Sequence, residues 1–312
     1  MSVTRRNFLD RVVAVQDALA QPLLIDQALT ETSHNNRARI LRNGLMVVTF
    51  SALEDFIRER SAEVLGYISR TALVFSDLPR DLVLAATVEV MRAAHAHAKM
   101  ASRHGDDPVP LLQQAASEVA STLNGPLHIS KFSLGYNGSN VGADEVGNIL
   151  KTLHAGDPWN EMTRLGSRVG LGAVPLRDAY AQGLRLRNRA AHKADSNIQP
   201  SELLTFCQQA KAIALGFDLL ASRAARLIHD SATSFAQVSR PKLTDAISIV
   251  FVDFDGRRYA CKKENARRAL KIGLDRNAIW LHAISKARVS YDAVVERDKS
   301  GTAIRWESTD CA

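Results

Sequence analysis

The chain has 312 residues, of which 46% are hydrophobic and 6% aromatic, and its formal net charge is +7. This composition is typical of a helix-rich globular protein with one or two domains and a sizeable core. The sequence contains no run of about 18 apolar residues, which excludes a membrane-spanning helix, and its first ten residues lack the apolar segment of a secretion signal.

The charge and the cysteines indicate a partner and a compartment. The excess of Lys and Arg favours an anionic partner such as nucleic acid. Cys207, Cys261 and Cys311 are far apart in the sequence and fit neither a metal-binding spacing nor a set of disulfides. We therefore expect a cytoplasmic protein with no membrane association, no metal and no cofactor.

The first half of the chain is predicted to be helical. Apolar residues recur at helical spacing from Phe8 to Leu19 and predict an amphipathic helix over residues 5–30. A longer helix is expected over residues 37–69, and its centre, LMVVTFSALEDFI, is apolar nearly all round, as in a helix buried on most sides. Shorter helices are expected over residues 81–103, 111–123, 145–154 and 160–169, with a Gly-, Asn- and Ser-rich loop before residue 145.

Two further helices follow in close succession. The first is expected over residues 175–193 and ends at the polar segment ADSNIQP. Pro200 suits the first turn of the second, which runs to about His229 with the strongest helical periodicity in the chain. Residues 1–235 are therefore interpreted as a helical bundle whose last two long helices form a hairpin.

From residue 241 the pattern changes to short β-rich segments. AISIVFVDF and RRYACK flank Asp255-Gly256, which predicts a hairpin. A helix is expected in NARRALKIGL, followed by strands in ARVSYDAVVE and TAIRWES. We thus predict a mainly α fold class, with a small α+β domain of unknown role over residues 241–312.

The segment GLRLRNRAAHKADS, residues 183–196, places several arginines beside a single histidine. Histidine exchanges protons near neutral pH, and arginine carries a permanent charge suited to phosphate, so the two can cleave RNA without a metal. On a helix Asn188 and His192 share a face, whereas Arg187 lies about 100° from Asn188. A two-fold-related helix would double this sparse set around one phosphate, which predicts a dimer. The alternative is a basic helix end that only complements the helix macrodipole.

Three segments, in this order, resemble one protein family. RNGLMVVTFSALEDFIRER is similar to the early helix of the RiboL-PSP-type HEPN group, and YNGSNVGADEVGNILKTLHAG to the loop and short helix that this group inserts before its motif helix. RNRAAH resembles the R-x(4–6)-H signature of HEPN domains. The resemblance covers roughly residues 5–230, and the β-rich region lies outside it.

The resemblance implies a helical domain that forms homodimers and acts as a metal-independent endoribonuclease, a toxin or antiviral-defence effector with an antitoxin or another regulatory protein as partner. It implies Arg187 and His192 as the catalytic pair and Asn188 as the neighbour that orients the histidine or a phosphate oxygen. Attack by the 2′-OH would leave a 2′,3′-cyclic phosphate and a 5′-hydroxyl. Some members keep the fold without nuclease activity, so the alternative function is a non-catalytic helical interaction or nucleic-acid-binding module.

Other charged residues have two interpretations each. Glu54 lies in an apolar helix stretch, so its carboxylate requires a partner. Either it supports the site, by pairing with Arg187 or by lying at the rim, or it forms a structural ion pair elsewhere or is exposed on a minor polar face. We favour the second, structural interpretation. A basic cluster in the β-rich region either holds an RNA backbone or is a solvated face, and the solvated face is favoured. Its members are Lys262, Lys263, Arg267, Arg268 and Lys271.

Overall fold

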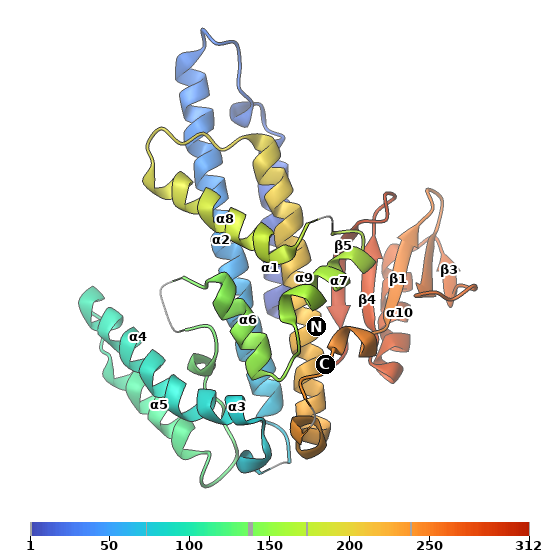
Figure 1. Ribbon diagram of the computed structural model, residues 1–312. Coiled ribbons are helices and arrows are strands. Elements are labelled where there is room, and N and C mark those ends of the chain that lie inside the picture. Colours follow the sequence, from blue (N-terminus) through green and yellow to red (C-terminus); the bar gives the residue numbers. More distant parts are fainter. Residues whose placement is uncertain (1, 73, 137–139, 173, 238, 312) are drawn as a thin grey trace.

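The protein is mainly helical, with a five-stranded sheet built from its last 65 or so residues (Figure 1). The computed structural model describes residues 2–72, 74–136, 140–172, 174–237 and 239–311. The predicted fold class is confirmed. The helices of the first region are α1 (Val3–Leu19), α2 (Thr32–Ile68), α3 (Arg80–Leu84), α4 (Val90–His104), α5 (Val109–Ala120), α6 (Ala143–Thr152), α7 (Pro158–Arg168), α8 (Leu176–His192) and α9 (Pro200–Gln237).

Two long helices, α2 and α9, run side by side and form the centre of the helical region (Figure 1). The predicted burial of α2 on most sides is confirmed, because Phe50, Leu53 and Ile57 are all inaccessible to solvent. On α9 the apolar residues predicted at steps of three and four, such as Phe217 and Leu220, are likewise inaccessible. Most of the stability of such helices comes from this packing rather than from helix propensity.

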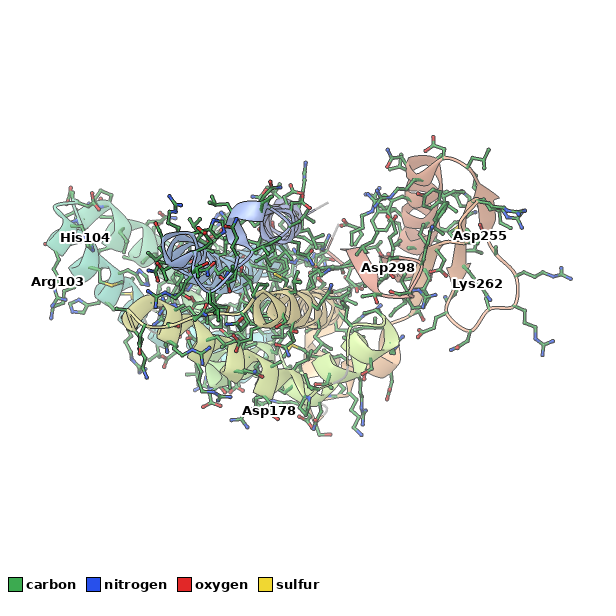
Figure 2. All side chains as sticks on the ribbon, turned by 90° about the horizontal axis from the view of Figure 1, so that it is seen from above. Arg103, His104, Asp178, Asp255, Lys262 and Asp298 are labelled. Carbon is green, nitrogen blue, oxygen red and sulfur yellow. The ribbon has the colours of Figure 1, made fainter. Side chains whose placement is uncertain are left out.

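The α2–α9 pair separates two outer layers. Helix α1 packs against one side of the pair, and α7 and α8 pack against the other. Figure 2, seen from above, shows this arrangement, with Asp178 marking α8 on the side away from α1. Sites on α1 and on α8 therefore face different surfaces of the molecule.

Two helix predictions differ from the structure. The first helix ends at Leu19 rather than near residue 30, and a 3-10 turn begins at Pro22, whose ring cannot continue the backbone hydrogen bonds of the helix. The helix predicted over residues 81–103 is present as α3 and α4, joined by a π-helical turn at Ala85–Glu89. A single inserted residue in a helix produces such a turn without ending the helix.

The C-terminal sheet has the strand order β3-β2-β1-β4-β5. The predicted hairpin is confirmed: β1 and β2 pair antiparallel, and Gly256 at the turn has φ +96°, which glycine adopts without strain. Helix α10 connects β1–β3 to β4, which pairs parallel with β1. The elements are β1 (Ile249–Phe254), β2 (Tyr259–Lys263), β3 (Lys271–Gly273), α10 (Arg276–Ser290), β4 (Ala293–Arg297) and β5 (Ala303–Ser308).

The helix predicted in NARRALKIGL is wrong. Residues 264–270 form turns, with Asn265 at φ +61°, and residues 271–273 form β3. The helix of this region is α10, which begins after Asp275, whose side chain accepts hydrogen bonds from the amides of Asn277 and Ala278. Because α10 extends to Ser290, the first part of the strand predicted in ARVSYDAVVE is helical as well.

The sheet is buried on both faces. Val250, Val252 and Val294 pack against α10, whereas Phe251 and Val295 belong to the main core, together with residues of α2 and α9. Alternation along each strand sends successive side chains to opposite faces, so one layer is covered by α10 and the other by the helical region. The division of the chain into residues 1–235 and 241–312 as separate domains stays a prediction.

A buried carboxylate joins the helical region to the sheet. Asp218 of α9 accepts hydrogen bonds from Arg5 Nε of α1 and Arg60 Nε of α2, each 2.6 Å long, and from the Trp306 indole of β5, 2.7 Å long. Burial opposes ionisation of Asp218, but the two guanidinium groups outweigh it and hold the pKa of Asp218 well below its ordinary value. Arg5 Nη1 also lies 2.7 Å from the carboxylate of Glu307.

Gly183 lets α8 approach α9 closely. A Cβ atom at this position would lie 2.1 Å from Cε2 of the fully buried Phe206. We expect Gly183→Ala to lower the free energy of unfolding by about 1–3 kcal/mol, because overpacking outweighs the gain in helix propensity. The measurement is urea denaturation, with Gly44→Ala on α2 as control. A Cβ at Gly44 meets nothing within 4 Å, so that variant should keep or gain stability; an equal loss in both would contradict the packing argument.

Asp310 follows β5 and is almost fully buried, with one carboxylate oxygen 3.3 Å from Arg223 Nε. Burial raises the pKa of Asp310 to about 6, which Arg223 only partly offsets. A raised pKa favours the protonated form, so this group contributes stability below its unfolded pKa that is lost as the pH rises through about 6.

Between about pH 4 and pH 7 ionisation of Asp310 is expected to lower the free energy of unfolding of the wild type by up to about 3 kcal/mol. The Asp310→Asn variant cannot ionise at this position and should not show this decrease. Unfolding free energies measured across this pH range should diverge, with the variant gaining on the wild type as the pH rises. Asp245→Asn, at an exposed position, serves as control and should follow the wild-type profile. Parallel curves for the wild type and Asp310→Asn would refute the assignment.

Candidate active site

Helix α8 carries the predicted motif and is fixed by its neighbours at both ends. It begins after Pro175 and buries Ala179, Tyr180 and Leu186 against the bundle. Its end is set by the following loop, because Asn43 of α2 donates to the carbonyl of Ser196 at 2.8 Å. The fully buried Arg42 donates to the Ile198 carbonyl and to Asn197 Oδ1 of that loop, each at 2.9 Å. The last turn of α8 is thus held in place although its outer side chains are exposed.

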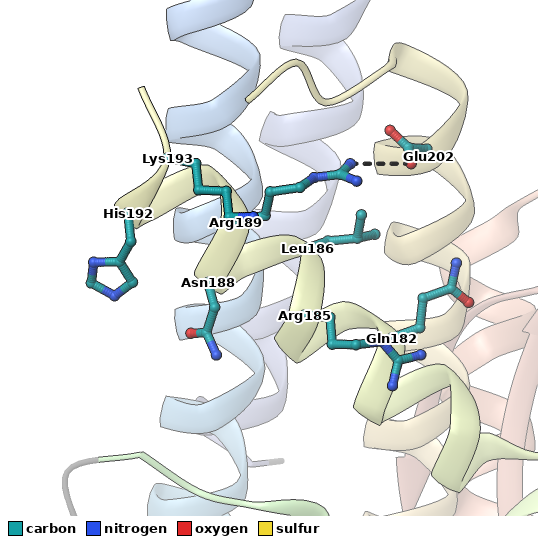
Figure 3. Close-up of a pocket in the computed structure, with 8 residues that line it drawn as sticks. All are labelled: Gln182, Arg185, Leu186, Asn188, Arg189, His192, Lys193 and Glu202. Atoms are coloured by element: carbon teal, nitrogen blue, oxygen red, sulfur yellow. Dashed lines mark hydrogen bonds and ion pairs between the residues drawn. The ribbon is translucent and has the colours of Figure 1, made fainter. Parts of the chain in front are cut away.

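A groove of about 670 Å³ lies along the exposed face of α8 and reaches the start of α9. Figure 3 shows Asn188 and His192 projecting from the same side of the helix, while Arg189 turns toward Glu202 of α9, 3.5 Å away. Three cationic side chains and one carboxylate line the groove, which gives it a positive character suited to a polyanion. Its lining is Gln182, Arg185, Leu186, Asn188, Arg189, His192, Lys193 and Glu202.

The groove brings together two of the three predicted catalytic residues. Asn188 and His192 line it, but Arg187 does not. Five residues along a helix correspond to a rotation of about 140°, so Arg187 and His192 face different directions within one protomer. Arg187 is connected to the groove through Asn188, because its Nη1 donates to Asn188 Oδ1 at 3.0 Å. The amide nitrogen of Asn188 is thereby left as a donor for a ligand.

Glu54 lies behind Arg187 and holds the loop that precedes α6. Its buried carboxylate accepts a hydrogen bond from the Val141 amide at 2.8 Å, and the hydroxyl of Tyr180 donates to the Val141 carbonyl at 2.6 Å. The neighbouring Asn140 accepts from Arg187 at 3.4 Å. Burial raises the pKa of Glu54, and the nearby charges of Arg58 and Arg187 oppose that rise. The burial of Glu54 excludes its exposure on a polar helix face, and its role in the site stays a prediction.

Three cations of the groove were not predicted as site residues. Arg185 precedes His192 by seven residues, which is two helical turns, so the two side chains lie on one face. Arg189 lies in the same last turn as the histidine, and Lys193 follows the histidine directly after the helix ends. Helical spacing counted back from His192 would have found Arg185; the motif spacing pointed instead to Arg187, which lies on another face.

Comparison with protein families places this helix in a known domain. The family model for RiboL-PSP-HEPN matches residues 20–221, which is more than half of the chain. The chain belongs to the RiboL-PSP-HEPN family. The match runs from just after α1 into α9, and it includes α2, α8 and the groove. Comparisons with curated proteins and with solved structures gave no match.

The basic cluster of the C-terminal region lies outside the RiboL-PSP-HEPN match. The structure does not bring its members to one face. Lys262 and Lys263 are neighbours on β2 and point to opposite faces of the sheet, and Lys263 Nζ lies 3.0 Å from the buried Asp292. Arg267 and Arg268 are exposed in the loop before β3. Figure 2 shows Lys262 on the sheet, well apart from α8. Nucleic-acid binding by this cluster stays a prediction.

The described part of this HEPN protein contains neither a metal-binding cluster nor a membrane-spanning helix. Within the described ranges, no three His, Cys, Asp or Glu side chains form a group able to hold a metal ion. His97, on α4, packs against the rings of Phe132 and Tyr136, with centroids 5.3 and 5.2 Å away. Among the helices that the structure describes, none has the length and apolar character required to cross a membrane.

Proposed function

We propose that the protein is a metal-independent endoribonuclease of HEPN type. The observation that supports this most is the exposed groove on α8, where His192 and Asn188 stand among Arg185, Arg189 and Lys193. A cationic groove binds the phosphates of an RNA strand without regard to sequence, and the histidine within it can transfer protons. Membership of the RiboL-PSP-HEPN family adds an independent reason.

In the proposed reaction the ribose 2′-OH attacks the adjacent phosphorus. His192 accepts the 2′-OH proton, a second acid protonates the departing 5′-oxygen, and the products carry a 2′,3′-cyclic phosphate and a 5′-hydroxyl. Negative charge grows on the non-bridging oxygens as the bond forms. Arginine side chains and the Asn188 amide offset that charge, and fixed donors of this kind act mainly on the transition state.

The reaction needs two proton-transfer groups, and one protomer offers one histidine in the groove. We infer a homodimer in which the α8 helices of two copies face each other, so that His192 of the partner subunit supplies the acid. Membership of the RiboL-PSP-HEPN family supports this inference, because many domains of the HEPN family form dimers.

The biological setting that we propose is a toxin or antiviral-defence system in the cytoplasm. A ribonuclease that degrades cellular RNA has to be inhibited by a partner, such as an antitoxin or another regulatory protein, until it is needed. The three cysteines of the chain are free thiols, which fits the reducing conditions of that compartment.

A specific observation also favours the alternative, a non-catalytic interaction or nucleic-acid-binding module. Within one protomer, Arg187 points away from the groove and donates to Asn188 and Asn140. If no dimer brings Arg187 to His192, the groove can bind RNA but lacks the second residue of the predicted catalytic pair. This alternative predicts RNA binding without turnover.

The deciding experiment is an RNA cleavage assay in EDTA with the full chain. Single-stranded RNA is incubated with wild type, Arg187→Ala and His192→Ala, and the product ends are identified by their reactivity to phosphatase and kinase. We expect cyclic-phosphate and 5′-hydroxyl ends from wild type alone. Cleavage that survives both substitutions would contradict the assignment, and binding without any cleavage would establish the alternative.

A further inference from the structure

A second cavity lies on the opposite side of the α2–α9 pair from the α8 groove. It has a volume of about 440 Å³ and is enclosed by the first turns of α1, the start of α10 and the strand β5. This volume is within the range of small-molecule pockets, about 300–1,000 Å³. Its lining is Ser2, Arg5, Arg6, Leu9, Asp10, Val13, Arg276, Trp280, Ile304, Arg305, Trp306 and Glu307.

Two arginines of this cavity are oriented by one buried carboxylate. Arg276 Nε donates to one oxygen of Glu296 at 2.6 Å, and Arg305 Nε donates to the other. Glu296 is only 2% exposed, so its hydrogen bonds fix both guanidinium groups on the protein side of the cavity. The Arg305 guanidinium also stacks on the ring of Trp280, 4.1 Å from the ring centroid. One negative charge serves two positive ones, which leaves the pair with an excess positive charge.

The outer nitrogens of Arg276 and Arg305 form no hydrogen bond with the described residues, whereas each Nε is occupied by Glu296. Arg305 Nη2 is buried, so the Arg276 side chain, which is 46% exposed, is the more accessible donor of the two. The first turn of α1 adds the positive end of its dipole, although the Thr4 and Arg5 amides already donate to Glu63 and to the Ser2 cap. Paired guanidinium donors match the oxygens of a phosphate group.

Part of the remaining wall is apolar, and the rest carries two arginines balanced by the carboxylates of Asp10 and Glu307. Leu9 and Val13 lie one turn apart on α1 and line the cavity together with Ile304 of β5. Inorganic phosphate would leave this wall uncovered, whereas a ligand with an apolar or aromatic body attached to its phosphate would cover it. A cavity of this volume suits a small molecule rather than a folded macromolecule.

We propose that this cavity binds a small organic phosphate of the nucleotide class, with its phosphate on Arg276 and Arg305 and its base or sugar against Leu9, Val13 and Ile304. The ligand would touch α1 of the helical region and α10 and β5 of the C-terminal region at once. Binding of this ligand would give a role to the C-terminal region, which lies outside the RiboL-PSP-HEPN match. The proposal is independent of RNA cleavage at α8.

The test is isothermal titration of the full chain with AMP, GMP, CMP and UMP, and with adenosine and inorganic phosphate as partial ligands. At least one nucleotide should bind wild type at least about tenfold more tightly than both partial ligands. Arg276→Gln should weaken that binding about tenfold or more. Arg288→Gln removes the same charge from an exposed position on the same helix and should leave the affinity unchanged.

Two further variants make the result unambiguous. Val13→Glu places a negative charge on the cavity wall at a position that is half exposed, so the fold is retained and nucleotide binding should weaken as with Arg276→Gln. Arg185→Gln lies in the α8 groove and should bind nucleotide like wild type. The proposal is overturned if no nucleotide binds, if inorganic phosphate binds as tightly, if Arg276→Gln and Val13→Glu both bind normally, or if Arg185→Gln abolishes binding.

Discussion

Replacing His192 by alanine is expected to slow RNA cleavage by about 10²- to 10⁴-fold, the usual contribution of a positioned acid or base. His192 is exposed at the end of α8, and the buried side chains of that helix all precede it, so the fold should persist. Initial cleavage rates in EDTA measure the effect, with circular dichroism and sedimentation as checks on folding and association. A variant that cleaves at the wild-type rate would remove His192 from the mechanism.

The matched control is His104→Ala. His104 is also an exposed histidine in the last turn of a helix, at the end of α4 next to Arg103 (Figure 2). Both substitutions therefore remove the same favourable interaction with a helix macrodipole. His104→Ala should cleave RNA like wild type; an equal loss in the two variants would mean that destabilised helix ends, rather than proton transfer, explain the result.

Replacing Asp218 by alanine is expected to lower the free energy of unfolding by about 3–5 kcal/mol. The substitution leaves the buried guanidinium groups of Arg5 and Arg60 without their shared carboxylate, and the Trp306 indole without its acceptor. Removal of one partner from a buried ion pair costs far more than the pair itself contributes, because the remaining charges stay desolvated. Denaturation in urea, followed by circular dichroism, measures the loss.

Asp55→Ala provides the comparison for this prediction. Asp55 pairs with Arg11 at 3.0 Å between the same two helices, α1 and α2, but both side chains are more than half exposed. An exposed pair contributes about 0–1 kcal/mol. If Asp218→Ala and Asp55→Ala destabilise the protein equally, the buried network does not hold the sheet to the helices.

Long periodic segments were the part of the fold that the sequence could predict. The apolar repeats of α2 and α9 are predictable because a buried helix face requires apolar residues at helical spacing. The Asp255-Gly256 hairpin is predictable because its turn requires a residue that adopts positive φ. The segment NARRALKIGL was misread because its composition suits a helix, whereas tertiary pairing of Lys271 with Cys261 makes part of it a strand. In short segments, contacts with residues distant in the sequence outweigh the intrinsic secondary-structure propensity.

The candidate site was predictable only in part, for a related reason. Asn188 and His192 share the groove because four residues nearly complete a helical turn. The contact of Glu54 with the Val141 amide joins positions 87 apart in the sequence, and the clamp of Glu296 on Arg276 and Arg305 depends on the sheet register. No spacing rule connects such residues before the chain is folded.

The arrangement around Asp218 also constrains how the protein matures on the ribosome. Arg5 is made among the first residues, but Trp306 and Glu307, which complete its surroundings, are separated from it by some 300 positions. Contacts between such distant positions form late and slow folding. A nascent chain that already carries α8 therefore still lacks the strand that secures α1 to α9, and the finished assembly is reached only after synthesis has passed β5.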